Sequence, residues 1–419
     1  MSFSKYRVVC SLLTFGIALV AMGADWPQFR GPNRDGVSSE VGLLKKWPSG
    51  GLKELWSATD LGAGHSTLTI QDGRLFTMGD HPEDNTNVLH VRSVKDGKEI
   101  WKKKVGKPGG PGWGDFKGPR STPTADGDRV YALGQYGELV CFLVEDGGEV
   151  WRRHYTDDFG GPLPEWGFSD SLLIDGSKLL CMPGGEQGCV VALDKMTGKV
   201  LWRSTDFKDK AEYASLIRVV VDGVAQYLAL TMSHLAGISV DDGSVLWKAE
   251  RKGQTAVCAT PIYKDNHIYV TSGYGVGCNL FEVRKKDGEF RAKEIYKNKV
   301  MVNHHGGAVL VGDHIYGYSD GKGWVCQNFK TGKMKWREKK KLGKGTITYA
   351  DGCFYLRDEG KTSTIALIEA SPDGYKELGR FDQPHHRSDA NGWAVPVVLG
   401  GRLYLRDQEW LFCFDVRGK

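Results

Sequence analysis

Six aromatic or basic residues precede segments that alternate like β-strands, and their types suit them to hold a small molecule. They are Arg120, Trp166, Tyr213, His304, Lys344 and Trp393. Aromatic rings offer flat faces for stacking, and guanidinium, ammonium and imidazole groups can hold an anion. We therefore predict a pocket for a small molecule or a cofactor. In the alternative interpretation, Arg120 binds backbone carbonyls beneath its loop, and Trp113, Trp166 and Trp393 are lids packed over the core.

Two carboxylates could add further chemistry to such a pocket. Asp170 lies close after Trp166, and Glu186 lies in a glycine-rich loop. Each is a candidate calcium ligand or general base, although solvated loop carboxylates are the commoner explanation for acidic residues of this kind. His304 and His305 are adjacent, and neighbouring residues on a strand point to opposite faces. We therefore expect these two histidines not to share a metal ion.

The elements that must position these residues are marked by a repeat. A tight turn ending in glycine recurs at Gly97, Gly147, Gly198, Gly243, Gly288, Gly332, Gly374 and Gly418. A tryptophan follows four residues after five of these glycines, at Trp101, Trp151, Trp202, Trp247 and Trp336. Repeats spaced by about 45 residues are typical of solenoids and propellers. We predict that the five tryptophans pack between neighbouring units.

Each repeat contains four short strand-like segments separated by turns, and no window shows a sustained helical period. This pattern predicts an all-β fold, a single eight-bladed β-propeller of four-stranded antiparallel blades. The last repeat supplies only three strands, whereas residues 52–56 form a tryptophan strand with no preceding three. We therefore predict that this N-terminal strand closes the ring as the outer strand of the eighth blade.

The N-terminus predicts export. Lys5 and Arg7 precede an apolar run that ends at small residues near Ala24, so residues 1–24 read as a signal peptide. An uncleaved anchor is the alternative. We expect residues 25–50 to form an N-terminal segment, residues 51–419 to form the propeller, and the mature chain to have no stable membrane span. The predicted location is the bacterial periplasm or the extracellular space.

Composition limits the classes of partner. The chain of 419 residues has a net charge of +5, which falls to +3 when the basic signal segment is removed. This charge is too weak to predict nucleic-acid binding. We expect a monomer whose partner is a small molecule or another exported protein.

Eight cysteines remain after the signal segment, and export permits disulfides among them. Cys141, Cys326 and Cys413 occupy one equivalent strand position, where another repeat has Ala192, so they are predicted to be small buried core residues. Cys181 and Cys189 flank a short hairpin loop and form the one pair that could be tested for a bridge.

Residues 192–202 resemble a known repeat family. The segment from Ala192 to Trp202 matches every fixed position of the A-x-D-x-x-T-G-x-x-x-W motif of PQQ-type propellers, and the resemblance covers nearly the whole mature chain. The family includes quinoprotein alcohol dehydrogenases, which bind pyrroloquinoline quinone (PQQ) and usually calcium. It also includes non-catalytic relatives such as the propeller of the outer-membrane assembly machine. The segment from Asp25 to Pro32 is similar to the start of many exported bacterial PQQ-like repeat proteins.

The resemblance implies two alternatives for function. In the first, the protein is an exported scaffold that binds a ligand or another protein. In the second, it is a PQQ-dependent alcohol or sugar dehydrogenase in which Arg120 and Lys344 hold the cofactor, Trp166 or Trp393 stacks on it, and Asp170 or Glu186 is the base. The chain lacks the vicinal cysteine pair typical of the dehydrogenases, and no calcium-ligand set can be aligned. We therefore favour the scaffold.

Overall fold

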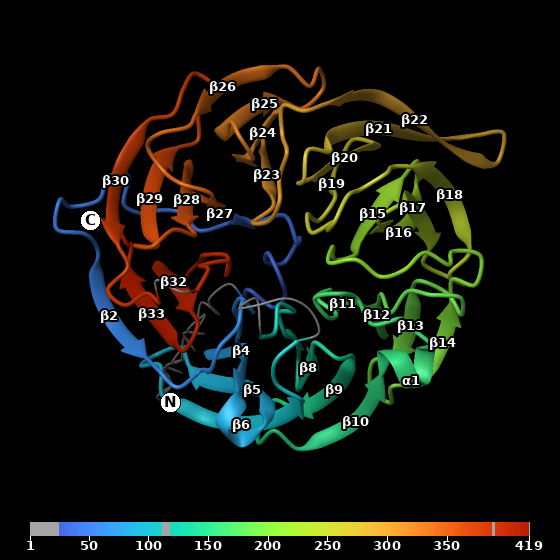
Figure 1. The fold of residues 1–419 in the computed structure, drawn as a ribbon, viewed down its shortest axis with the longest axis horizontal. Helices are drawn as coiled ribbons and strands as arrows, with labels where there is room; N and C mark the ends of the chain where they lie inside the picture. The colour runs from blue at the N-terminus through green and yellow to red at the C-terminus, as the bar shows by residue number, and fades with distance from the viewer. Residues whose placement is uncertain (1–24, 111–117, 388–389, 419) are drawn as a thin grey trace, which may run out of the picture.

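Eight antiparallel sheets form a ring around a central channel in the computed structural model, which describes residues 25–110, 118–387 and 390–418 (Figure 1). The predicted signal peptide, residues 1–24, and Trp113 lie outside the described residues. Six blades follow the chain from inner to outer strand. They are β3 (Thr69–Gln71), β4 (Arg74–His81), β5 (Thr86–Ser93) and β6 (Glu99–Gly106); β7 (Thr124–Asp126), β8 (Arg129–Leu133), β9 (Glu138–Leu143) and β10 (Glu149–His154); β11 (Leu173–Asp175), β12 (Lys178–Cys181), β13 (Val191–Asp194) and β14 (Val200–Arg203); β15 (Ile217–Val221), β16 (Val224–Leu230), β17 (His234–Ser239) and β18 (Val245–Glu250); β19 (Ile262–Lys264), β20 (His267–Ser272), β21 (Gly277–Lys286) and β22 (Glu289–Asn298); and β23 (Ala308–Val311), β24 (His314–Ser319), β25 (Gly323–Asn328) and β26 (Met334–Glu338).

The last two blades include strands from the N-terminal part of the chain. Blade seven consists of β27 (Gly345–Ala350), β28 (Cys353–Asp358), β29 (Thr364–Glu369) and β30 (Glu377–Asp382), and β1 (Val37–Ser38) pairs in parallel with its inner strand. Blade eight consists of β31 (Val397–Leu399), β32 (Arg402–Asp407), β33 (Trp410–Asp415) and the outer strand β2 (Lys53–Ala58). The eight-bladed fold and its closure by an N-terminal strand are therefore confirmed. The described helices are the short α1 (Tyr155–Phe159) and the 3-10 turn η1 (Pro82–Asp84), and neither is long enough to cross a membrane.

Tryptophan rings of four blades pack on the turn glycine of the next blade, at Gly97, Gly147, Gly198 and Gly243. The glycine of one blade's turn lies against the tryptophan of the blade before it, so that a Cβ on Gly97 would lie 2.6 Å from the ring of Trp56. The Nε1 of Trp56 also donates to the carbonyl of Val94 at 3.1 Å. The glycines at these four joints have φ values between 69° and 78°, a conformation that a side chain disfavours. Glycine at this position thus provides both the turn and the flat surface that the ring covers.

The other tryptophans also contact the next blade, although only some of them lie on its turn glycine. Trp101 and Trp151 pack on the turn glycines of the next blades, and their Nε1 atoms donate to next-blade carbonyls at 3.0 Å. Trp202 lies on Gly243, and Trp336 donates to a blade-seven carbonyl. Trp247 instead donates to Gln226 of its own blade, yet it packs in an apolar cluster shared with blade five. The predicted packing role of the five tryptophans is confirmed.

The cysteine predictions can be compared with the strand register. Cys141, Cys326 and Cys413 lie opposite Trp151, Trp336 and Trp56 respectively, and Ala192 lies opposite Trp202. These are buried positions where a small side chain leaves room for the indole ring, as predicted. Cys181 and Cys189 are both free thiols and form no bridge.

Part of the N-terminal segment lies inside the ring, where it contacts three blades. Figure 1 shows it as the dark blue trace inside the ring. Trp26 pairs its backbone with Ile70 of blade one. Arg34 donates to the carbonyls of Ser171 and Leu172 in blade three at 2.7 and 2.9 Å, and Arg30 donates to Ala308 O in blade six at 2.6 Å. The segment thus connects opposite sides of the ring and closes the channel.

The closure can be tested by comparing two tryptophans in equivalent positions. Trp56 lies on the N-terminal strand and Trp151 on an interior blade; both are partly buried and make the same Nε1 bond. We expect Trp56→Ala and Trp151→Ala to lower the free energy of unfolding by similar amounts, roughly 3 kcal/mol. Urea denaturation followed by circular dichroism measures both losses. A near-zero loss for Trp56→Ala beside a large loss for Trp151→Ala would contradict closure by β2.

Candidate functional site

A cavity of about 220 Å³ lies on the ring axis, on the face where outer strands connect to the next inner strands. Seven of the eight blades contribute lining residues, nearly all from the loops that enter the inner strands. Phe29 and Arg30 of the N-terminal segment also line it. The cavity is therefore a product of ring closure, because its walls come from segments far apart in the sequence.

The structure brings most of the predicted binding residues together. Arg120, Trp166, Tyr213, His304 and Trp393 all line the cavity. Lys344 lies behind this lining, where its Nζ donates to Nδ1 of His304 at 2.5 Å. Arg120 also donates to the carbonyl of Trp166 at 2.9 Å, so the carbonyl contact of the alternative interpretation is present as well. Ligand binding by these residues stays a prediction.

The two predicted acidic residues lie away from the cavity. Asp170 sits between two lining residues, Ser169 and Ser171, but its own Oδ2 accepts bonds from Tyr155 Oη and Met182 N, both at 3.1 Å. Burial raises the pKa of Asp170 to about 6. Glu186 is 87% exposed and lies 3.6 Å from Lys208 Nζ. Among the described lining residues there is no carboxylate, so neither residue is placed to act as a base or a calcium ligand there.

The expectation that His304 and His305 face opposite ways is wrong. Both rings line the cavity, and their centroids are 5.2 Å apart. The expectation assumed a strand, but β23 begins only at Ala308, and Gly306 and Gly307 turn the chain with φ values of 79° and 71°. In a loop the alternation of strand side chains does not apply.

Hydrogen bonds fix the orientation of His304. Lys344 can only donate, so Nδ1 of His304 is the acceptor and its Nε2 carries the proton. This Nε2 lies 2.8 Å from the hydroxyl of Tyr274, which also lines the cavity. Burial, with the nearby His305 and Lys344, lowers the pKa of His304 to about 3. His304 is therefore neutral, and the Tyr274 hydroxyl can donate into the cavity.

Glu359, which sequence reasoning missed, orients two lining residues. Its Oε2 accepts bonds from His305 Nε2 at 2.6 Å and Trp393 Nε1 at 2.5 Å. Burial favours the neutral carboxyl, but the bond and charge of His305, together with Lys344, hold the pKa of Glu359 below its usual range. Glu359 lies between the second and third strands of blade seven, and no motif marks it.

His65 is the least satisfied polar residue of the cavity. It is 8% exposed, and neither ring nitrogen has a hydrogen-bond partner. Its ring lies 4.5 Å from that of Trp393. Burial is the main reason that the pKa of His65 lies well below its usual value, and the charges of Arg120 and Arg406 add to it. The structure thus holds a neutral imidazole at the cavity with both nitrogens unpaired.

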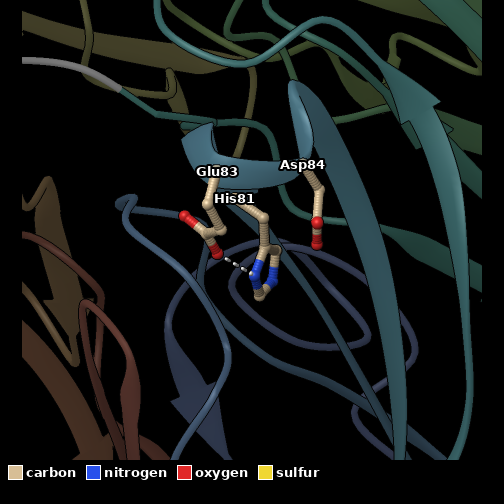
Figure 2. A group of neighbouring side chains, drawn as sticks. All are labelled: His81, Glu83 and Asp84. Atoms are coloured by element: carbon tan, nitrogen blue, oxygen red, sulfur yellow. Dashed lines mark hydrogen bonds and ion pairs between the residues drawn. The ribbon is translucent and has the colours of Figure 1, made fainter.

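A second cluster lies away from the axis, in the loop between β4 and β5. Figure 2 shows His81, Glu83 and Asp84 with their side chains turned toward one another, and their candidate ligand atoms lie within 4.8 Å. Nδ1 of His81 is 3.2 Å from Glu83, and Nε2 is 3.0 Å from Nε2 of His90. The sequence analysis did not identify this group. Both carboxylates are exposed, and such acidic groups are common without an ion, so we assign it no function.

Comparison with known proteins places the fold among PQQ-like propellers. A family model described as "Outer membrane protein assembly factor BamB" matches residues 84–337. The outer membrane protein assembly factor BamB of Shewanella oneidensis is 23% identical over 341 residues, covering 71% of this chain and 84% of that protein.

Solved structures agree on the fold. The crystal structure of BamB from Moraxella catarrhalis has a TM-score of 0.60 at 13% identity, covering 88% of this chain and 98% of that one. Quinohemoprotein alcohol dehydrogenase from Comamonas testosteroni has a TM-score of 0.68 at 13% identity, covering 96% and 82%. Propellers of both kinds therefore share this architecture, and the fold by itself does not choose between their functions.

The buried position of Asp170 predicts a pH effect on stability. Because folding raises its pKa from the ordinary 3.8 to about 6, the folded state binds the proton more tightly. The free energy of unfolding should therefore fall as pH rises from about 4 to about 6. Asp170→Asn stays neutral, so it should gain up to about 3 kcal/mol relative to wild type across this range. Urea titrations at each pH measure the difference, with the exposed turn residue Asp287→Asn as control. A difference that does not change with pH would refute the assignment.

Proposed function

This chain belongs to the PQQ-like propeller family whose model is described as outer membrane protein assembly factor BamB, and from that premise we propose that it is an exported, non-catalytic scaffold whose axial cavity binds a small molecule. The observation that carries the proposal is the composition of the cavity wall. Aromatic rings, two arginines and three histidines converge there, without a carboxylate among the described lining residues. An apolar pocket with a few convergent polar groups is the usual form of a ligand site.

The same wall argues against the dehydrogenase alternative. PQQ is a flat quinone with carboxylates, and Arg120, Trp166 and Trp393 would suit such a molecule. The calcium ion usually bound with it requires oxygen ligands, chiefly carboxylates. Asp170 is engaged by Tyr155 and Met182 beneath the wall, and Glu186 is exposed beside Lys208. The described residues therefore do not fit a calcium-bound quinone, and they offer no placed base.

A protein partner is a second candidate, favoured by the outer strands. The residue before the tryptophan is an exposed aliphatic in three successive blades, at Ile100, Val150 and Leu201. These side chains lie on outer strands, whose free edges face away from the ring (Figure 1). Exposed apolar groups beside an unpaired strand edge suit contact with another chain. If the chain is exported, as residues 1–24 predict, such a partner would be another exported protein in the same compartment.

Ligand retention tests the proposed function. We expect native mass spectrometry of the protein purified from its own cells to show a bound small molecule. Trp393→Ala should reduce its retention about tenfold or more, because the ring forms part of the cavity wall. The matched control is Trp410→Ala, which lies in the same blade, stacks on His385 and does not line the cavity. Equal occupancy of both variants would place the molecule elsewhere, and no bound molecule in any form would contradict the proposal.

Addition of PQQ and calcium tests the alternative. We expect calcium to leave PQQ binding unchanged, because the cavity wall supplies no described carboxylate for the ion. We also expect no dye reduction with primary alcohols or aldose sugars. Spectroscopic titration and a dye-linked assay measure the two outcomes. Saturable calcium-dependent PQQ binding with alcohol-dependent dye reduction would establish the dehydrogenase instead.

A further inference from the structure

Several buried arginines surround the axial cavity without a carboxylate in direct contact. Arg30, Arg34 and Arg406 are at most 3% exposed, and none forms an ion pair with a described carboxylate. They bond instead to backbone carbonyls, as when Arg406 donates to Ser66 O at 3.1 Å and Gly62 O at 3.2 Å. Carbonyl dipoles satisfy the donors, and the carboxylates of Asp35, Asp170 and Asp80 offset part of the charge without forming ion pairs. Burying a cation without a paired opposite charge is costly, so a bound anion would be stabilised there.

His65 lies at the centre of this positive region. The charged groups that face it come from four blades: Arg120 and His305 approach from neighbouring loops, and Arg357 and Arg406 from β28 and β32. The charge of Arg357 is partly offset by Asp407, whose Oδ2 lies 3.3 Å from it. Burial, with these cations, holds the pKa of His65 well below its usual value, so the imidazole is neutral. Both of its nitrogens are nevertheless unpaired at the cavity wall.

We propose that the axial cavity binds a small organic anion with a flat aromatic part, that no metal ion takes part, and that His65 takes up a proton when the anion binds. The inference rests on the proposed function, because it names the ligand class of the same cavity. A bound carboxylate supplies the negative charge and the acceptor that His65 lacks. The neutral imidazole gains a proton from solvent, and the resulting imidazolium donates to the carboxylate through one N–H.

The remaining wall residues fit the rest of such a ligand. Trp393 lies beside His65, and Trp166 and Tyr213 pack together with ring centroids 5.9 Å apart. These rings offer apolar faces to a flat group. The Tyr274 hydroxyl, which accepts from His304, can donate its own proton to the anion. The ligand is thus held by stacking on one part and by donors on the other.

The donor set explains why a metal ion is not required. Both nitrogens of His304 are used by Lys344 and Tyr274, and Nε2 of His305 is used by Glu359. The described wall then offers His65, the single Nδ1 of His305 and the thiol of Cys258, with no carboxylate. Burial raises the pKa of the Cys258 thiol, so it stays protonated and is a poor metal ligand. Calcium prefers oxygen ligands, and the described wall supplies no charged oxygen ligand for it.

Proton uptake by His65 predicts how the affinity for the anion changes with pH. If the complex holds one more proton than the free protein, the affinity for the anion rises as pH falls, approaching tenfold per pH unit while one whole proton is taken up. A neutral ligand of the same shape shows no such rise. The two behaviours separate an anion site from an apolar pocket.

Isothermal titration with 2-naphthoate and its neutral analogue 2-naphthamide tests the proposal. Both are titrated in the presence of EDTA between about pH 8 and about pH 5, in buffers of different ionisation enthalpy. We expect 2-naphthoate to bind at least about tenfold more tightly than 2-naphthamide at the acid end. We also expect its heat of binding to depend on the buffer, since one proton is taken from it. A parallel titration without EDTA is the reference, and binding of 2-naphthoate that occurs there but not with EDTA would overturn the metal-free site.

Variants assign the proton to a residue. His65→Gln keeps a hydrogen-bonding side chain but cannot titrate, so naphthoate binding should persist at the alkaline end and lose its rise toward acid. The matched control His267→Gln, on β20 outside the cavity, should behave as wild type. If the rise survives in His65→Gln and disappears in His305→Gln, then His65 is not the proton acceptor.

The outcomes separate this inference from the proposed function. Equal affinity for the acid and the amide, or binding of 2-naphthoate without proton uptake, overturns the inference and leaves a small-molecule scaffold intact. Failure of both probes while wild-type protein retains a neutral molecule does the same. Failure of both probes with no retained molecule removes the inference and the proposed function together.

Discussion

The structure depends on one repeated contact, a tryptophan ring of one blade packed on the turn glycine of the next. The contact needs glycine twice, because the turn has a positive φ and because a Cβ on Gly147 or Gly198 would lie less than 3 Å from the ring. The indole nitrogen adds a hydrogen bond across the same joint. These joints fix blades eight, one, two, three and four relative to their neighbours, so they also fix the loops of these blades on the opposite face. The axial cavity inherits its shape from them.

Ring packing alone would leave an open channel, and the N-terminal segment closes it. The two arginines of this segment, Arg30 and Arg34, have positive φ values of 62° and 58° and extend to opposite sides of the ring. Their guanidinium groups donate to backbone carbonyls at the inner ends of blades six and three, where the described residues supply no neighbouring strand to bond with. This closure turns a channel into a cavity with a floor. It also places two arginines that form no ion pair beside the cavity, where Asp35 and Asp170 offset part of their charge.

Sequence reasoning could predict the blades because glycine and tryptophan spacing follows directly from the joint. It could also predict Arg120, Trp166 and Trp393 at the cavity, since they lie in loops that must enter inner strands. It placed Asp170 wrongly because the side chain of Asp170 turns from the cavity to accept bonds from Tyr155 and Met182, contacts that leave no local pattern. Glu359 and Arg30 could not be predicted, because they reach the site by tertiary paths that leave no local pattern.

The comparison of fold and wall shows where function resides in this architecture. A quinohemoprotein alcohol dehydrogenase and an assembly factor share this propeller fold. The ring therefore positions the loop side chains, and the types of those side chains determine the chemistry. A calcium ion bound with a quinone needs oxygen ligands, chiefly carboxylates, whereas the described wall of this cavity presents histidines and arginines, and Asp170 turns into the blade. The chemistry that this ring can support therefore depends on which side chains its loops direct into the cavity.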